Sequence, residues 1–232
     1  MAMGATPHPP SRRRRPVPLL HRRGVRVPGS VACWVDLYWG ILVCDVLSSA
    51  PEQLMFVPLP EDYQSHSFPM VRGRPNVYST MGCVVGQIRL LYMDGYDDSM
   101  CPKDQVTINT WTLLGFPAQA RWVMDDNLKL RCGDLWEDES FLAVPGLPKR
   151  PPMCPVLSPK YPNEVYFFSS DIGYVDGHVP AKGEHLLVLD MRSKKIQSWS
   201  KCPSGRSREL FPSFITAEFG GWASKKRRSD KV

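Results

Sequence analysis

The chain has 232 residues, of which 43% are hydrophobic and 22% are charged. This composition is typical of a globular protein and excludes a collagen, a coiled coil and a wholly disordered chain. The 23 prolines and 17 glycines argue against long helices, because proline removes a backbone donor and clashes with the preceding helical turn. We therefore expect one folded core flanked by two tails.

The net charge of +6 is carried by the two ends of the chain. Residues 1–30 contain seven arginines and no acidic residue, and residues 219–232 carry a balance of +4. Residues 31–218 are therefore mildly acidic, with a balance of −5. The sequence predicts a disordered Arg/Pro-rich arm over 1–30, a β-rich domain over 31–218 and a disordered basic tail over 219–232. Any binding of nucleic acid is expected through these tails only.

Targeting signals are sparse. The longest apolar stretch, residues 37–47, includes Asp45 and is much shorter than the ~20 residues that span a bilayer, so we expect no membrane segment. The N-terminal arm lacks the apolar core of a signal peptide, although its arginines leave an organelle-targeting role open. Seven cysteines without a repeated spacing favour reduced thiols. The sequence thus predicts a protein of the cytoplasm or nucleus.

The strongest strand signal is WVDLYWGILVCDVL, residues 34–47, which is rich in aromatic and β-branched residues. Gly40 divides it into two strands or marks a bulge. Both faces are mostly apolar: alternate residues place Val35, Leu37, Trp39, Ile41 and Val43 on one face, and Trp34, Tyr38, Leu42, Cys44 and Val46 on the other. Such strands belong to a sheet packed between other layers, and the lack of a long amphipathic helix favours a radial β stack over a parallel α/β sheet.

Other strands are expected to be short and separated by Gly, Pro, Asp and Ser clusters. The clearest hairpin is HLLVLDMRSKKIQSWS, with its turn at residues 190–194, and one helical turn is expected at 134–139. The Pro-rich stretch 145–162 is interpreted as an insertion between blade-like units. The further predicted strands are residues 54–59, 81–85, 87–93, 106–114, 121–130, 164–169, 185–191 and 195–200.

Several phrases occur in a specific order along the chain: WVDLYWGILVCDVL, FVPLP, VVGQIRLLYMD, NTWTLL with RWVMDD, and LSPKYPNEVYFFS with HLLVLDMRSKKIQSWS. Together they resemble the plant domain of unknown function 1618, a family similar to F-box-associated β-propeller regions. The resemblance covers about residues 31–200. It implies a β-rich, propeller-like body with no established activity, cofactor or catalytic residue.

The front of the chain departs from that family. Family members usually have a longer region before the phrase Trp34-Val35-Asp36-Leu37, whereas this chain has only the Arg/Pro-rich arm and no F-box helix pair. The resemblance therefore implies either a shortened member or an inaccurate gene model, and in both cases we expect an open set of blades. An open set would expose sheet faces and edges that a partner or a second copy covers.

Residue patterns that indicate chemistry are few. Asp36 and Asp45 are candidates for acid/base work in an apolar region, but a structural role in turns is favoured. One loop, residues 94–104, is rich in aspartate. A calcium site is an alternative for this acidic loop, but the EF-hand alternation is missing and a solvated loop is favoured. No Cys-x-x-Cys occurs and the five histidines have no metal-ligand spacing, so no cofactor or metal is expected. The acidic loop contains Asp94, Asp97, Asp98 and Asp104.

Tryptophans are the remaining candidates for partner binding, since they are enriched at interface hot spots. Trp111, Trp122 and Trp199 lie on predicted strands and are expected in the core, while Trp136 lies on the predicted helical turn. Trp222 is the candidate exposed aromatic. The basic tail beside it has a run of nuclear-import type, for which a solvated tail is the alternative. That run is Lys225, Lys226, Arg227 and Arg228.

The sequence thus predicts an all-β fold: a partial, irregular β-propeller-like stack of antiparallel sheets in about three blade-like units, with disordered termini. The expected function is that of a non-enzymatic protein-interaction module with an unknown protein partner. The alternative is a nuclear polyanion or nucleic-acid binder that acts through its basic tails. A third hypothesis is a hydrolase that uses an Asp or Cys in a pocket at the centre of the blades.

Overall fold

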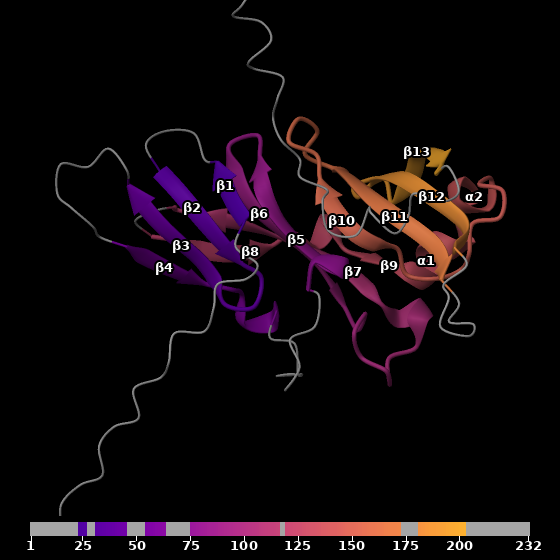
Figure 1. Cartoon of the computed structure of the whole chain (residues 1–232), viewed down its shortest axis with the longest axis horizontal. Helices are drawn as coiled ribbons and strands as arrows, with labels where there is room; N and C mark the ends of the chain where they lie inside the picture. The colour runs from indigo at the N-terminus through magenta and orange to yellow at the C-terminus, as the bar shows by residue number, and fades with distance from the viewer. Residues whose placement is uncertain are drawn as a thin grey trace, which may run out of the picture.

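The structure, a computed structural model, describes residues 23–26, 31–45, 54–63, 75–116, 119–172 and 181–202. These residues form three antiparallel sheets, with two short α-helices and a few 3-10 turns. Figure 1 shows the first sheet at the left, the third at the right and β5 of the second sheet between them. The predicted all-β fold in three sheets is confirmed.

The first sheet has the order β1-β2-β3-β4 and comes from the phrase predicted to form strands. Gly40 begins the second of two strands, and the Asp36 Oδ1 accepts a hydrogen bond from the Tyr38 backbone N–H at 2.9 Å in the turn between them. Asp36 therefore has the structural role that the sequence favoured. The four residues of β1 belong to this sheet, although the sequence placed them in the N-terminal arm. The strands are β1 (Arg23–Arg26), β2 (Val31–Asp36), β3 (Gly40–Asp45) and β4 (Met55–Pro58).

The second sheet has the order β5-β6-β7-β8, with a short fifth strand paired to β7. The single strand predicted at 121–130 is wrong in its second half. Asp125 accepts a hydrogen bond from the Asn127 backbone N–H at 3.1 Å and starts a 3-10 turn, η4 (Asp126–Leu128), which ends the strand. The strands are β5 (Ser79–Val84), β6 (Gln87–Asp94), β7 (Thr107–Leu114), β8 (Arg121–Met124) and β9 (Leu130–Arg131).

The third sheet has the order β10-β11-β12-β13, and its last two strands form the predicted hairpin. The interpretation of residues 145–162 as an insertion is wrong, because they contain the sheet's first strand. That strand tolerates Pro155 because it lies at the sheet edge and has a register shift between Met153 and Val156. The strands are β10 (Met153–Leu157), β11 (Glu164–Ile172), β12 (Ala181–Asp190) and β13 (Lys195–Lys201).

The helices are short and lie beside the third sheet (Figure 1). α1 (Cys132–Glu137) confirms the predicted helical turn, and α2 (Glu139–Leu142) follows it directly. The Ser140 hydroxyl donates to Asp138 and accepts from the Ile196 backbone N–H at 2.9 Å, which joins α2 to β13. No helix within the described ranges is both long and apolar enough to cross a membrane.

The sheets meet near their first strands, since β5 contacts both β1 and β10. Each sheet continues outward from that line as an antiparallel meander in chain order. A large core joins the second sheet to the third, and a smaller core joins the first to the second. The arrangement is compatible with a partial propeller-like stack.

The pairing of β3 with β4 leaves no room for a side chain at Gly40. Its φ is +148°, and an added Cβ would overlap the Val57 carbonyl oxygen across the strand pair. We expect Gly40→Ala to lower the free energy of unfolding by about 2 kcal/mol or more, measured by urea denaturation. Gly146 is the matched control, because its φ is +70° and an added Cβ would meet nothing within 4 Å. Equal losses for the two variants would contradict this role of Gly40.

Candidate interaction face on the first sheet

The first sheet has one covered face, which we call its inner face. Cys33, Val35, Ile41, Val43 and Val57 point to this side and are at most 4% exposed. All of them except Val35 pack with Ile88 and Leu113 of the second sheet in the smaller core. This burial follows from the period-two alternation of β2, β3 and β4. The inner face is therefore the junction between the first two sheets.

The junction also has a specific polar contact. The indole Nε1–H of Trp122, on β8, donates a hydrogen bond to the Pro58 carbonyl oxygen at 2.7 Å, on β4. Pro58 ends the outermost strand of the first sheet, whereas Trp122 lies on the fourth strand of the second. This bond fixes how the far strands of the two sheets face each other.

The opposite side, which we call the outer face, carries apolar side chains, several of which are exposed. The register pairs Trp34 with Leu42 and Leu42 with Phe56, which places all three in one row across the sheet. Cys44 lies in the next row on β3, and Leu54 precedes β4 on the same side as Phe56. Trp34, Leu54 and Phe56 are 37%, 57% and 54% exposed, while Leu42 and Cys44 are half-buried. We define the outer face as Trp34, Leu42, Cys44, Leu54 and Phe56.

A tyrosine cluster supports the junction from one end. The Tyr63 hydroxyl donates to the Leu37 carbonyl oxygen at 2.7 Å and lies 3.2 Å from the Ser79 hydroxyl. Its ring centroid is 4.6 Å from that of Tyr92, which connects the 3-10 turn η1 (Glu61–Tyr63) to β6. Burial raises the pKa of Tyr63 above its ordinary range and raises that of Tyr96 to about 12. Both hydroxyls therefore stay protonated at neutral pH, and that of Tyr63 serves as a structural hydrogen-bonding group.

Buried thiols are poor candidates for a nucleophile. None of the seven cysteines forms a disulfide. Burial raises the pKa of Cys33 to about 11, with Cys83 nearby, and raises the pKa of Cys132 to about 12. Because the thiolate is the reactive form, these two groups are unreactive at neutral pH.

The buried polar residues of the third sheet lie on both of its faces. Glu184 and His185 are 5% and 1% exposed, and Ser169 and Ser170 lie on the neighbouring strand. Consecutive residues of a strand point to opposite faces, so Glu184 and His185 are on different sides of the sheet. Ser169 pairs with His185 in the register. Glu184 is therefore not on the face that Ser169 and His185 share.

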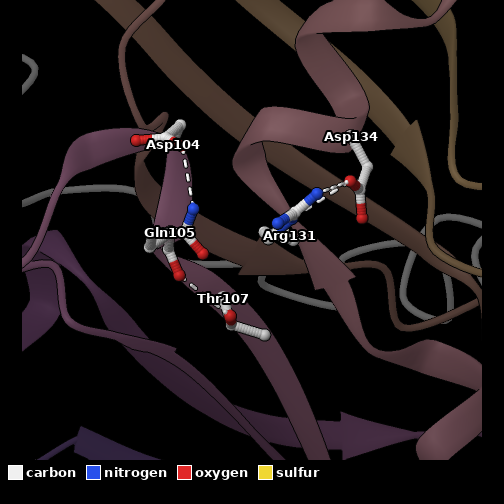
Figure 2. Close-up of polar contacts among 5 residues, drawn as sticks. All are labelled: Asp104, Gln105, Thr107, Arg131 and Asp134. Atoms are coloured by element: carbon white, nitrogen blue, oxygen red, sulfur yellow. Dashed lines mark hydrogen bonds and ion pairs between the residues drawn. The ribbon is translucent and has the colours of Figure 1, made fainter.

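The carboxylates of the acidic loop bind separate partners and do not form one site. Asp98 accepts from the Met100 backbone N–H at 2.8 Å, and Asp104 accepts from the Gln105 amide at 2.9 Å. Figure 2 shows that Arg131 pairs with Asp134, at 3.0 Å from its Nε, and not with Asp104. In the part of the chain that the structure describes, no three His, Cys, Asp or Glu side chains could hold one metal ion.

The tryptophans divide between core and surface. Trp111 and Trp136 are 3% and 8% exposed and belong to the large core. Trp199 is 43% exposed, so its predicted core position is wrong: it lies on β13, the last strand of the third sheet among the described residues. Trp222 and the basic run Lys225, Lys226, Arg227 and Arg228 lie outside the described residues, as does the side chain of Asp45.

Sequence reasoning found Trp34, Leu42 and Cys44 as one face but expected that face to be covered. Leu54 and Phe56 were predicted only as parts of a strand. Their alternation with Met55 and Val57 was a signal that pointed to a second two-faced strand. The local alternation does not distinguish the covered face from the exposed one, because that depends on where the second sheet packs.

Three antiparallel meanders in chain order, packed face to face, define a stacked all-β protein whose first sheet has a bare apolar face. The chain matches the family model described as a protein of unknown function, DUF1618, over residues 34–166. This match covers more than half of the 232 residues, and the chain belongs to that family. The match includes the first sheet from Trp34 onward, the second sheet and the start of the third. Comparisons with curated proteins and with solved structures gave no match.

The buried tyrosines should make the free energy of unfolding depend on pH in the alkaline range. Burial raises the pKa of Tyr63, Tyr78, Tyr92 and Tyr96 above the ordinary value of 10.0. A raised folded pKa gives stability that is fully present below pH 10 and is lost as the pH rises towards the folded values, because the unfolded chain releases its protons first. We expect the free energy of unfolding to fall steeply above about pH 10. As the pH is raised, the absorbance of tyrosinate should increase in the same range in which circular dichroism shows unfolding. If all eight tyrosines titrate near pH 10 while the chain stays folded, the expected burial effect is wrong.

Proposed function

We propose that this chain is a non-enzymatic protein-interaction module that binds its partner through the outer face of the first sheet. The observation that carries the proposal is the exposure of Trp34, Leu54 and Phe56 on a sheet whose inner face is buried. Exposed apolar patches of this kind mark interaction sites in folded proteins. Aromatic side chains at such a patch supply large contact areas when a partner covers them.

The chemistry of the outer face defines the kind of partner. Its five side chains carry no formal charge, so they favour an apolar surface over a charged peptide or a nucleic acid. The face is formed by three antiparallel strands, and the chain itself packs such faces against other sheets. The partner that fits best is a protein with an apolar sheet face.

The non-enzymatic part of the proposal has separate support. The raised pKa values of the buried Cys33 and Cys132 thiols disfavour nucleophilic chemistry. Glu184 and His185 lie on opposite faces of β12 and do not cooperate in proton transfer.

Proximity labelling in cells with the full chain fused to a labelling enzyme tests the proposed function. We expect proteins labelled above a scrambled control, and we expect Phe56→Lys to reduce their labelling at least fivefold, since a charge at the centre of an apolar contact opposes burial (about 1 kcal/mol or more). Leu142→Lys is the matched control, because Leu142 is 62% exposed on α2, beside the third sheet. The proposal is wrong if labelling never exceeds the control, or if both variants label the same proteins as the original chain.

A further inference from the structure

Two neighbouring residues of the third sheet have buried polar atoms without partners. Ser170, on β11, is 3% exposed, and Glu184, on β12, is 5% exposed. The Ser170 hydroxyl and both carboxylate oxygens of Glu184 have no hydrogen-bond partner among the described residues. Burying a carboxylate is costly unless a cation or several donors accompany it. The two residues therefore indicate a site for a group that carries positive charge and hydrogen-bond donors.

The register brings these two residues to one side of the sheet. Ser169 pairs with His185, and the register shifts directly after this pair, so Ser170 lies opposite the part of β12 that contains Glu184. Because strand residues alternate, Ser170 and Glu184 both lie on the side opposite Ser169 and His185. Phe168 is on the same side and is 4% exposed. We define the far side of the third sheet as Phe168, Ser170 and Glu184.

The described cores do not account for the burial of the far side. The large core contains Val165, Phe167, Leu187 and Leu189 of the third sheet, and all four lie on the other side. Phe168 belongs to neither the large nor the smaller core. The burial of the far side therefore points to a covering segment beyond the described ranges.

The chain that leaves β13 starts beside this site. The Cys202 backbone N–H donates to the Glu184 carbonyl oxygen at 2.9 Å. Burial and, as a second cause, the Glu184 carboxylate raise the pKa of the Cys202 thiol, which places that thiol near the carboxylate. Residues 203–208 have the sequence Pro-Ser-Gly-Arg-Ser-Arg, so the next cation along the chain is Arg206.

The sequence after β13 favours a reversal of the chain. Cys202-Pro203-Ser204-Gly205 has proline second and glycine fourth, which is typical of a type I turn. Such a turn keeps its first and fourth Cα atoms within about 7 Å, so Arg206 would begin close to Glu184. A guanidinium donates through five N–H groups and is more weakly hydrated than an ammonium group, which suits a buried carboxylate with a hydroxyl beside it.

We propose that Ser170 and Glu184 bind the guanidinium of Arg206, so that the segment after Cys202 folds back over the far side of the third sheet. A metal ion fits this site less well, because no three His, Cys, Asp or Glu side chains of the described residues could hold one. The chain itself then closes the far side, and the proposal does not depend on the function assigned to the first sheet.

Urea denaturation of the full chain tests the contact. Arg206→Gln should lower the urea midpoint by roughly 1 M, because it leaves the buried carboxylate unpaired. Adding Glu184→Gln to that variant should recover about half of the loss or more. Arg228→Gln and Lys182→Gln are the controls and should change the midpoint little. The proposal is overturned if Arg206→Gln has no effect, if Glu184→Gln alone raises the midpoint, or if Lys182 and not Arg206 is coupled to Glu184.

Trypsin cleavage of the folded full chain reports the position of the segment directly. Arg206 and Arg228 are matched sites, since each is followed by serine. We expect cleavage after Arg206 to be at least about tenfold slower than after Arg228, and Glu184→Gln to remove most of this difference. Equal rates at the two sites in the original chain overturn the proposal, and this comparison needs no variant to fold. Protection of Arg206 that a folded Glu184→Gln variant retains also overturns it, because another contact then holds the segment.

Discussion

The packing of the first sheet on the second is the interaction on which the interpretation of this molecule depends. Ile41 is fully buried in that contact, and Val43 and Val57 flank it on neighbouring strand positions. Because strand residues alternate between faces, burying these side chains turns Leu42 and Phe56 to the other side. The bare outer face is thus a direct geometric consequence of the junction, and it cannot be covered by rotating single side chains.

The alternation in residues 34–47 allowed both faces of β2 and β3 to be predicted from the sequence. It did not allow the covered face to be identified, since the two sets of side chains are about equally apolar. The choice depends on where the second sheet lies, which is set by contacts more than 40 residues away, such as the bond from Trp122 to Pro58. The two-residue alternation of a strand carries no information about which face is covered by tertiary packing.

The other errors have local physical causes. β10 was missed because Pro155 counts against a strand, and only its edge position makes the proline harmless. β1 was missed because Arg23 and Arg26 resemble the rest of a basic arm, whereas pairing to β2 depends on a partner strand and not on composition. The strand predicted over 121–130 is shorter in the structure because Asp125 accepts a hydrogen bond that starts a 3-10 turn.

The sheet edges explain why association should occur through a face. An unpaired edge strand is a template for adding another strand, and proteins block it with proline or lysine. β4 ends with Pro58, β10 contains Pro155, and β13 begins and ends with Lys195 and Lys201. These three edges are therefore poor sites for strand addition. Trp34, Leu54 and Phe56 have no comparable protection on the outer face, so the proposed association is favoured through that face over strand addition at β4, β10 or β13.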